Sequence, residues 1–184
     1  QMCIRDSLYI EGYQVTSPTG REAAIKAREI AEAAGVKTAL SFSDPGMVEF
    51  FRDGLEQMVG DKLDLVFANE DEAKGWAKVD TVEDAIEGHK QVANTFAITL
   101  GADGAVAWDG SEIHRIPPHQ VHAVDTNGAG DMFAGAFLYA ITRGEDFPTA
   151  GRFASLAAGK VVANYGPRLS APDYTALRAE FFGD

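Results

Sequence analysis

The segment 124–137 combines an anion-binding backbone with a carboxylate. It reads VDTNGAGDMFAGAF, and the small residues Gly128, Ala129 and Gly130 stand where a strand is predicted to give way to a helix. Because these residues carry no bulky side chain, their backbone N–H groups can converge on one point, and the helix dipole adds partial positive charge there. We interpret this junction as an anion site.

Asp131 follows directly, in the first turn of the predicted helix. Its carboxylate would lie beside the anion site, where it can accept a proton from an attacking hydroxyl. Phosphoryl transfer needs a base and charge stabilisation next to each other. The competing interpretation is structural: a tight turn followed by an acidic residue that suits a helix N-terminus. A glycine motif this short is a hypothesis about function.

Alternating strands and helices must position this motif. Strands are predicted at 8–11, 36–42, 63–68, 95–100 and 119–124, with a hairpin in 104–116 that turns at Asp109-Gly110. Helices are predicted at 20–34, 45–59, after Asn69, and at 82–92, 128–142, 149–164 and 172–182. Because parallel crossovers need helices, the order predicts an α/β fold with a mostly parallel sheet and helices on both faces. Ligands bind at the carboxyl ends of such strands, so we expect the loops after Phe42, Ala68, Leu100 and Val124 to gather at one edge.

Composition and charge exclude several classes of protein. A chain of 184 residues predicts one domain. Lys and Arg number 16 against 28 Asp and Glu, and this net charge of −12 disfavours binding to nucleic acid or an anionic membrane. No apolar run approaches the ~20 residues of a membrane span. This charge does not forbid the binding of a phosphate at a local site.

The N-terminal segment 1–7, QMCIRDS, has no clean period, and we expect it to be foreign to the fold or disordered. The fold then occupies 8–184 and begins as if in mid-domain. Cys3, the one cysteine, excludes an internal disulfide and a cysteine-built zinc site, is compatible with a reducing cytoplasm, and receives no role. The four histidines lack metal-ligand spacing near carboxylates, and we expect them at the surface or in strands.

The motif around Asp131 resembles the C-terminal signature D-T-x-G-A-G-D of ribokinase-like (PfkB) carbohydrate kinases. SDP at 43–45, NEDEA at 69–73, TLGADG at 99–104 and GPR at 166–168 follow the family in order, and LYIEGY and VVANYGPRL are most similar to bacterial adenosine-kinase-like members. The resemblance covers 8 to about 173. It implies the C-terminal nucleotide-binding and catalytic part of a three-layer α/β/α kinase with an antiparallel hairpin, without the N-terminal part and lid.

The resemblance implies a cytoplasmic, ATP-dependent phosphotransferase that moves the γ-phosphate to a hydroxyl of a sugar or nucleoside. It implies Mg²⁺, a monovalent cation such as K⁺, and a homodimer for the full-length protein. Asp131 matches the general base, and Gly128, Ala129 and Gly130 match the anion hole. The residues that match nucleotide-binding positions are Asn69, Thr99, Leu100, Gly101, Ala102, Asp103, Gly104, Ser155 and Asn164. Those that match magnesium or monovalent-cation positions are Glu72, Asp125, Asn127, Gly166 and Ser170.

Simpler interpretations compete with these roles. Asn69 and Glu72 also form a capping box, and 99–104 is also a hairpin-forming turn. Two other functions remain open: a nucleotide-binding module without transfer chemistry, and an inactive fragment of a kinase. An intact Asp131 beside an intact Gly-Ala-Gly argues against the pure binding module, which needs no base. The ending of the chain favours a nucleoside acceptor, although acceptor specificity in the family lies largely outside this part.

Overall fold

The computed structural model describes residues 7–183, which fold as two compact units. The first unit runs through Thr99 and includes Trp108–Ile113, and the second consists of Leu100–Ala107 and the chain from His114 onward. Each unit has its own apolar core. Leu40, Val66 and Phe96 are fully buried in the first.

Four parallel strands form the framework of the first unit. They are β1 (Ser7–Glu11), β2 (Lys37–Ser41), β3 (Leu63–Asn69) and β4 (Ala93–Thr99), paired in that order. Tyr9 pairs with Ala39 and Ala39 with Leu65, so the carboxyl ends of the strands share one edge. The parallel sheet predicted from the alternating pattern is confirmed.

The strand order of the sheet is β1-β2-β3-β4-β5-β6. The last two strands are β5 (Ala105–Trp108) and β6 (Ile113–Ile116), joined by the four residues of a turn. Asp109 holds this turn. Its N–H donates to Glu112 O at 3.2 Å, and its carboxylate accepts from the N–H groups of Ser111 and Glu112 at 2.7 Å each. The predicted hairpin at Asp109-Gly110 is therefore confirmed.

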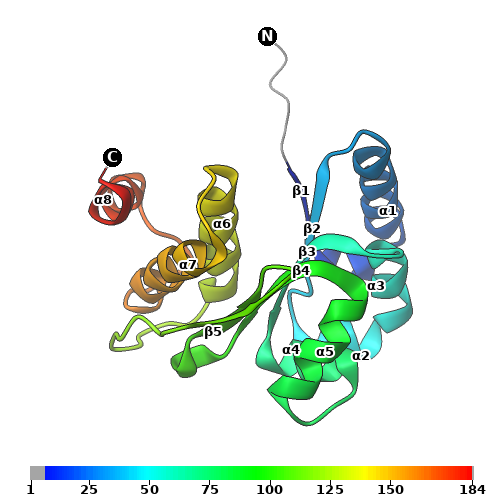
Figure 1. Cartoon of the computed structure of the whole chain (residues 1–184), viewed down its shortest axis with the longest axis horizontal. Coiled ribbons are helices and arrows are strands. Elements are labelled where there is room, and N and C mark those ends of the chain that lie inside the picture. Colours follow the sequence, from blue (N-terminus) through cyan, green and yellow to red (C-terminus); the bar gives the residue numbers. More distant parts are fainter. Residues whose placement is uncertain (1–6, 184) are drawn as a thin grey trace. The chain divides into compact units, whose positions relative to one another are not determined.

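The helices of the first unit join the parallel strands (Figure 1). In chain order they are η1 (Gly12–Thr16), α1 (Pro18–Ala33), α2 (Pro45–Phe50), α3 (Arg52–Val59), α4 (Glu70–Ala77) and α5 (Val82–Val92). A polar cap followed by proline starts two of them, because Ser17 and Asp44 accept from backbone N–H groups and proline needs no acceptor at the first position. The predicted helix 45–59 is divided at Phe51, which leaves the helical conformation at φ −123°.

An aromatic cluster fills the core between the strands and α4 and α5. Phe42 stacks on Trp76 with ring centroids 4.5 Å apart, and His89 meets Phe42 and Phe96 edge-on at 5.7 and 5.5 Å. His89 is fully buried on α5. The expectation that it lies at the surface or in a strand is therefore wrong. Its Nδ1 lies 2.9 Å from Ala85 O, one helical turn back, so the helix itself supplies a partner for one ring nitrogen. The buried Nε2 has no hydrogen-bond partner among the described residues.

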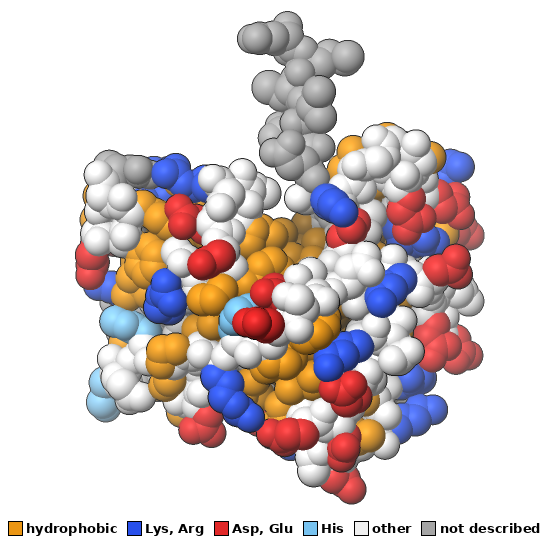
Figure 2. Space-filling model, viewed as in Figure 1, with side chains coloured by type: hydrophobic (Ala, Val, Ile, Leu, Met, Phe, Trp, Pro, Cys, Tyr) orange, Lys and Arg blue, Asp and Glu red, His pale blue; other side chains and the backbone are white. Residues whose placement is uncertain are grey.

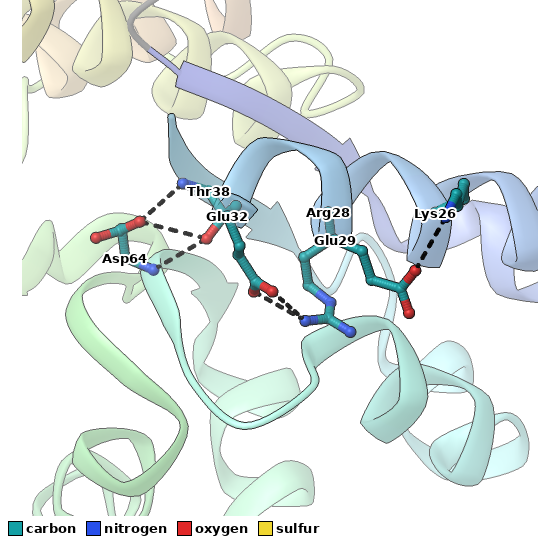
Figure 3. Close-up of polar contacts among 6 residues, drawn as sticks. All are labelled: Lys26, Arg28, Glu29, Glu32, Thr38 and Asp64. Atoms are coloured by element: carbon teal, nitrogen blue, oxygen red, sulfur yellow. Dashed lines mark hydrogen bonds and ion pairs between the residues drawn. The ribbon is translucent and has the colours of Figure 1, made fainter. Parts of the chain in front are cut away.

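Polar contacts fasten the amino ends of the strands and the surface of α1 (Figure 3). The Asp64 carboxylate accepts from the Thr38 N–H at 2.9 Å and pairs with Lys37 Nζ at 2.7 Å. Partial burial raises the pKa of Asp64, but the hydrogen bonds from Lys37 and Thr38 outweigh it, so this pKa lies below its ordinary value. Arg28 and Glu32 form an ion pair at 2.8 Å along α1.

The second unit holds most residues of the hairpin strands and the last three α-helices of the described chain. It contains η2 (Gly101–Asp103), α6 (Ala129–Thr142), α7 (Phe147–Val162) and α8 (Ala171–Phe182), and α6 and α7 lie side by side (Figure 1). Phe153 is fully buried and contacts Phe182 at 4.7 Å, which fixes α8 to α7. The strand predicted at 119–124 is absent from this described segment. Its backbone instead bonds to α7, with Val124 N–H donating to Val162 O at 2.8 Å.

Three further expectations concern the leading segment 1–7, the charged surface and membrane spans. The predicted leading segment 1–7 lies outside the described residues except for Ser7, which pairs with Lys37 as the first residue of β1. Acidic and basic side chains are interspersed over the face shown in Figure 2. No helix in the described part of the chain is long and apolar enough to cross a membrane.

Candidate active site

Gly128 starts the candidate site by turning the chain into α6. It adopts a left-handed conformation with φ 77°, and a Cβ at this position would lie 2.5 Å from Pro167 O. Both constraints exclude any other residue without strain, because left-handed backbone disfavours a side chain and the neighbour is a backbone atom. The glycine at this position therefore serves a close approach between the start of α6 and the segment after α7.

The first backbone N–H groups of α6 form an open set of donors. Ala129 N–H donates to Thr126 O at 3.2 Å, and Met132 N–H donates to Gly128 O at 2.9 Å. Within residues 7–183, no acceptor pairs with the N–H of Gly130 or Asp131. Helix geometry leaves such groups unpaired at an N-terminus, where they and the dipole favour an anion.

Asp131 brings a carboxylate to these donors. It belongs to the first turn of α6, its side chain is exposed, and no described residue forms a hydrogen bond or ion pair with that side chain. Gly130, next to it, has open space where a Cβ would be. The arrangement offers a carboxylate accessible to solvent and, one residue away, the N–H of Gly130, which pairs with no acceptor among the described residues.

Asp125 fastens the loop that precedes α6. Its carboxylate accepts from Asn127 N–H at 3.0 Å and from Gly166 N–H at 3.1 Å. These two hydrogen bonds, the first more than the second, hold the pKa of Asp125 below its ordinary value, so the group is ionised at neutral pH. Ser170, predicted as a further cation ligand, caps α8 by accepting from Asp173 N–H at 3.3 Å.

The predicted nucleotide loop is a tight turn that begins the second unit. Leu100 N–H donates to Gly104 O at 2.8 Å, which closes the turn, and Gly101, Ala102 and Asp103 are exposed at its tip. Gly104 has φ 90°, and a Cβ on it would lie 2.1 Å from Ile116 O. Thr99, the last residue of β4, precedes the loop. The turn interpretation is confirmed by this geometry, and the binding of a nucleotide by the loop stays a prediction.

Ser155 and Asn164, the two other predicted nucleotide residues of this unit, use their side chains within the protein. Ser155 Oγ accepts from His119 N–H at 3.0 Å and donates to Pro117 O at 3.1 Å. Asn164 Nδ2 donates to Lys160 O at 2.9 Å, and its side chain is exposed near the end of α7. A direct contact of either side chain with a nucleotide stays a prediction.

Asn69 and Glu72 form a capping box in the first unit, as one of the two interpretations predicted. Asn69 Oδ1 accepts from Glu72 N–H at 2.8 Å, and Glu72 Oε2 accepts from Asn69 N–H at 2.9 Å. Only 4% of Glu72 is exposed. Burial raises the pKa of Glu72 to about 7 against the opposing effect of the Asn69 hydrogen bond, and the charges of Asp44 and Asp71 raise it further.

A polar link between β1 and β2 escaped the sequence analysis. Ser43 Oγ accepts from Gly12 N–H at 2.8 Å and donates to Glu11 Oε2 at 3.0 Å, while Ser43 itself is left-handed at φ 70°. A Cβ on Gly12 would lie 2.6 Å from Phe42 O, so the two strand ends touch closely. The SDP motif marked the place, but no local signal in it predicts a left-handed serine.

The described residues contain no group of three or more His, Cys, Asp and Glu side chains that could hold a metal ion. The predicted metal ligands belong to both units. Glu72 belongs to the first unit, and Asp125, Asn127, Gly166 and Ser170 belong to the second.

Comparison with known proteins identifies the family. A family model described as pfkB family carbohydrate kinase matches residues 5–174, nearly the whole chain. The chain belongs to this family. Among curated members it is 34% identical to fructoselysine 6-kinase of Shigella flexneri over 73% of this chain and 48% of that protein. It is 30% identical to adenosine kinase of Schizophyllum commune over 92% of this chain and 54% of that protein.

Solved structures of the family have the same fold. Adenosine kinase from Sinorhizobium meliloti matches with a TM-score of 0.89 and 32% identity, over 95% of this chain and 54% of that chain. A probable sugar kinase from Rhizobium etli matches with a TM-score of 0.87 and 33% identity, over 96% of this chain and 54% of that one. The ribokinase-like α/β fold implied by the DTNGAGD motif is therefore confirmed. The chain spans about half the length of the relatives it matches.

Proposed function

We propose that this pfkB family chain carries the base and the anion site of an ATP-dependent phosphotransferase, which moves the γ-phosphate of ATP to a hydroxyl of a sugar or nucleoside. The observation that carries the proposal is the start of α6, where the unpaired N–H groups of Gly130 and Asp131 adjoin an exposed carboxylate. Phosphoryl transfer demands mainly alignment and charge stabilisation, which such fixed donors supply.

Asp131 acts in this proposal as the general base. Its carboxylate accepts the proton of the acceptor hydroxyl as the hydroxyl oxygen attacks the γ-phosphorus, and the bond from phosphorus to the leaving ADP oxygen breaks. The adjacent amides stabilise the negative charge on the transferred group. The side chain is free for this role because it has no partner among the described residues.

The loop Leu100–Gly104 holds the nucleotide phosphates and ribose in the same proposal. Its closed turn and exposed tip present backbone groups to solvent in a fixed conformation. Asp103 at the tip can accept hydrogen bonds from ribose hydroxyls. A fixed loop lowers the entropic cost of binding a flexible polyphosphate.

Glu72 fits a magnesium ion by its chemistry. A buried carboxylate with a pKa of about 7, near the acidic Asp44 and Asp71, lacks a compensating positive charge, and a divalent cation would supply it. Magnesium usually takes few protein carboxylates and keeps several waters, so one glutamate suffices. When bound, the ion would neutralise phosphate charge. Asn69 orients the Glu72 carboxylate through its two N–H donors at 2.7 and 2.9 Å.

Asp125 fits a monovalent cation less fully. The ionised carboxylate is the hard oxygen donor that such an ion prefers, but both of its oxygens already accept backbone N–H groups, those of Asn127 and Gly166. The Ser170 hydroxyl instead donates to Asp173 Oδ2 at 2.5 Å within its own helix cap. The role of an ion there would be to hold the loop before α6.

The acceptor class proposed is a sugar or a nucleoside. Two of the relatives reported above differ in the substrate that their names state, fructoselysine for one and adenosine for the other. Fructoselysine and adenosine both carry alcohol hydroxyls, the group from which a carboxylate base can take a proton.

Substitution of Asp131 by Asn tests the proposal. Titration calorimetry with Mg-ATP and an ADP-release assay over a panel of sugars and nucleosides are run on the chain and the variant. We expect wild type and Asp131→Asn to bind Mg-ATP within twofold of each other and turnover to fall by about 10²–10⁴. Unchanged kcat in Asp131→Asn removes Asp131 as the base. Binding without turnover in the wild type favours one of the two other functions, a nucleotide-binding module or an inactive fragment of a kinase.

A further inference from the structure

The segment Ile116–His119 lies between the loop Leu100–Gly104 and helix α7 in the second unit. It leaves β6 at Ile116 and continues as Pro117, Pro118 and His119, outside any ladder or helix. Ile116 is buried, whereas Pro117 and His119 are exposed. Its conformation must therefore be fixed by contacts with its two neighbours.

Helix α7 contacts this segment through one face. Gly151, Ser155 and Gly159 recur every four residues and so share that face. A Cβ on Gly151 would lie 2.6 Å from Ile116 Cδ1, and one on Gly159 would lie 2.9 Å from His119 Cδ2. The absence of side chains at both glycines lets the segment lie directly against the helix backbone.

Ser155 supplies the polar contact in the middle of that face. Proline has no N–H, so Pro117 and Pro118 cannot donate a backbone hydrogen bond. The Ser155 hydroxyl accepts from His119 N–H at 3.0 Å and donates to Pro117 O at 3.1 Å. One hydroxyl thus satisfies both backbone groups and uses its only proton to do so.

The predicted nucleotide loop rests on the other side of the same segment. A Cβ on Gly104 would lie 2.1 Å from Ile116 O and 2.8 Å from Pro118 N. At such distances, the backbone of Gly104 cannot keep its place if residues 116–118 shift toward it. The position of the loop end therefore depends on where α7 holds the segment.

We propose that Ser155 is a positioning residue for the nucleotide loop, which acts through the segment Ile116–His119 and Gly104. The inference rests on the proposed nucleotide site and deepens it, because it gives the hydroxyl a task other than contact with the nucleotide. The Ser155 hydroxyl orders the segment, the segment supports Gly104, and the loop keeps the conformation that binds phosphates and ribose.

Two perturbations of the same segment test the proposal. Ser155→Ala removes both hydrogen bonds, and Gly159→Ala leaves them but pushes a methyl group toward His119. Each is compared with Ser155→Thr, which keeps the hydroxyl. Each is also compared with Thr142→Ala, which removes a helical hydroxyl that donates to the Leu138 and Tyr139 carbonyls of α6. The readouts are Mg-ADP affinity by calorimetry and amide exchange of peptides covering 100–104 and 116–119.

We expect Ser155→Ala to weaken Mg-ADP binding by roughly fivefold to tenfold, within the range that loss of one or two neutral hydrogen bonds produces. We expect Gly159→Ala to weaken it in the same direction, because the added methyl group would displace His119 and with it the segment. Exchange at 100–104 should accelerate in both, while Ser155→Thr and Thr142→Ala stay within twofold of wild type. The proposal is overturned if Ser155→Ala weakens binding with unchanged exchange at 100–104 and Gly159→Ala binds normally, since that pattern means direct contact. It is also overturned if neither variant changes exchange there.

The exchange measurement separates this proposal from the proposed function. If the wild-type chain fails to bind Mg-ADP, the nucleotide site is wrong, yet faster exchange at 100–104 in Ser155→Ala still demonstrates the mechanical link. If the wild type binds and exchange is unaffected, the nucleotide site survives and the positioning role of Ser155 fails.

Discussion

Replacing Glu72 by Gln should make the protein less stable than the wild type at acidic pH and more stable than the wild type at alkaline pH. The folded chain raises the pKa of Glu72 from 4.5 to about 7, mainly by burial, so between these values the folded state keeps a proton that the unfolded chain releases. Stability of the wild type therefore falls as pH rises from about 4.5 to about 7. Each pKa unit corresponds to about 1.4 kcal/mol, which makes the full fall about 3 kcal/mol.

The Glu72→Gln variant has no carboxyl group to titrate at this position, but it also loses one hydrogen-bond acceptor. Glu72 accepts from Asn69 N–H and from Asn69 Nδ2, and a glutamine oxygen can replace only one carboxylate oxygen. We assign that loss a pH-independent cost of about 1 kcal/mol. Glu72→Gln should then be less stable than wild type at pH 5 and about 2 kcal/mol more stable at pH 8, where the 3 kcal/mol penalty is absent.

Urea unfolding followed by tryptophan fluorescence measures this difference across pH 5–8. Trp76 stacks on Phe42 in the same unit, so its emission reports on the relevant core. The matched control is Glu49→Gln, an exposed carboxylate on α2, whose stability curve should run parallel to that of the wild type. Parallel curves for wild type and Glu72→Gln over the whole range would refute the argument that burial of this carboxylate opposes its ionisation.

Two further predictions concern the buried histidine and the glycines of α6. Burial lowers the pKa of His89, so the folded state excludes a proton that the unfolded chain binds, and stability is lost as pH falls below 6.5, by at most about 1.4 kcal/mol per pH unit. His89→Leu should lack this acid-side slope in urea titrations, and an unchanged slope would contradict it. Gly128→Ala should destabilise the protein by about 1–3 kcal/mol because it places a side chain in left-handed backbone against Pro167. Gly130→Ala, with open space at that position, should keep the wild-type melting temperature but weaken Mg-ATP binding. Equal melting temperatures for Gly128→Ala and Gly130→Ala would count against the role of Gly128.

Much of the fold was predictable because caps and hydrophobic runs are local signals. The helix Val82–Val92 matches its predicted bounds, since Thr81 caps it and a strand of buried residues follows. The start of α4 was equally predictable, because the side chains of Asn69 and Glu72 each accept a hydrogen bond from the other residue's backbone N–H. The parallel order followed from the alternation of strands and helices.

The wrong predictions arose where distant residues decide the local structure. The alternating letters of 119–124 are typical of a strand, but in the structure the segment bonds to Ser155 and to the end of α7, and no partner strand is available to it among the described residues. The division of the predicted helix 45–59 at Phe51 could not be predicted, because Phe51 is neither glycine nor proline and has neither beside it. His89 was misplaced because its satisfying partner, Ala85 O, is a backbone atom, which side-chain identity does not display.

The candidate site follows the same division. The DTNGAGD motif indicates an anion site and a base by residue type alone, and the exposed Asp131 and open amides agree with that chemistry. The sequence motif does not predict what fixes the conformation of the two glycine loops, because the contacts come from backbone atoms far along the chain. Gly128 lies against Pro167, and Gly104 lies against Ile116.

These two glycines show how the second unit builds its candidate site. Both are left-handed, and both meet a carbonyl oxygen of a distant segment at a distance that excludes a Cβ. Close backbone approach, rather than a network of side chains, thus sets the position of the start of α6 and of the predicted nucleotide loop. Residues at the exposed tips, such as Ala102 and Asn127, should then tolerate substitution, whereas a single methyl group at Gly104 or Gly128 displaces a whole loop.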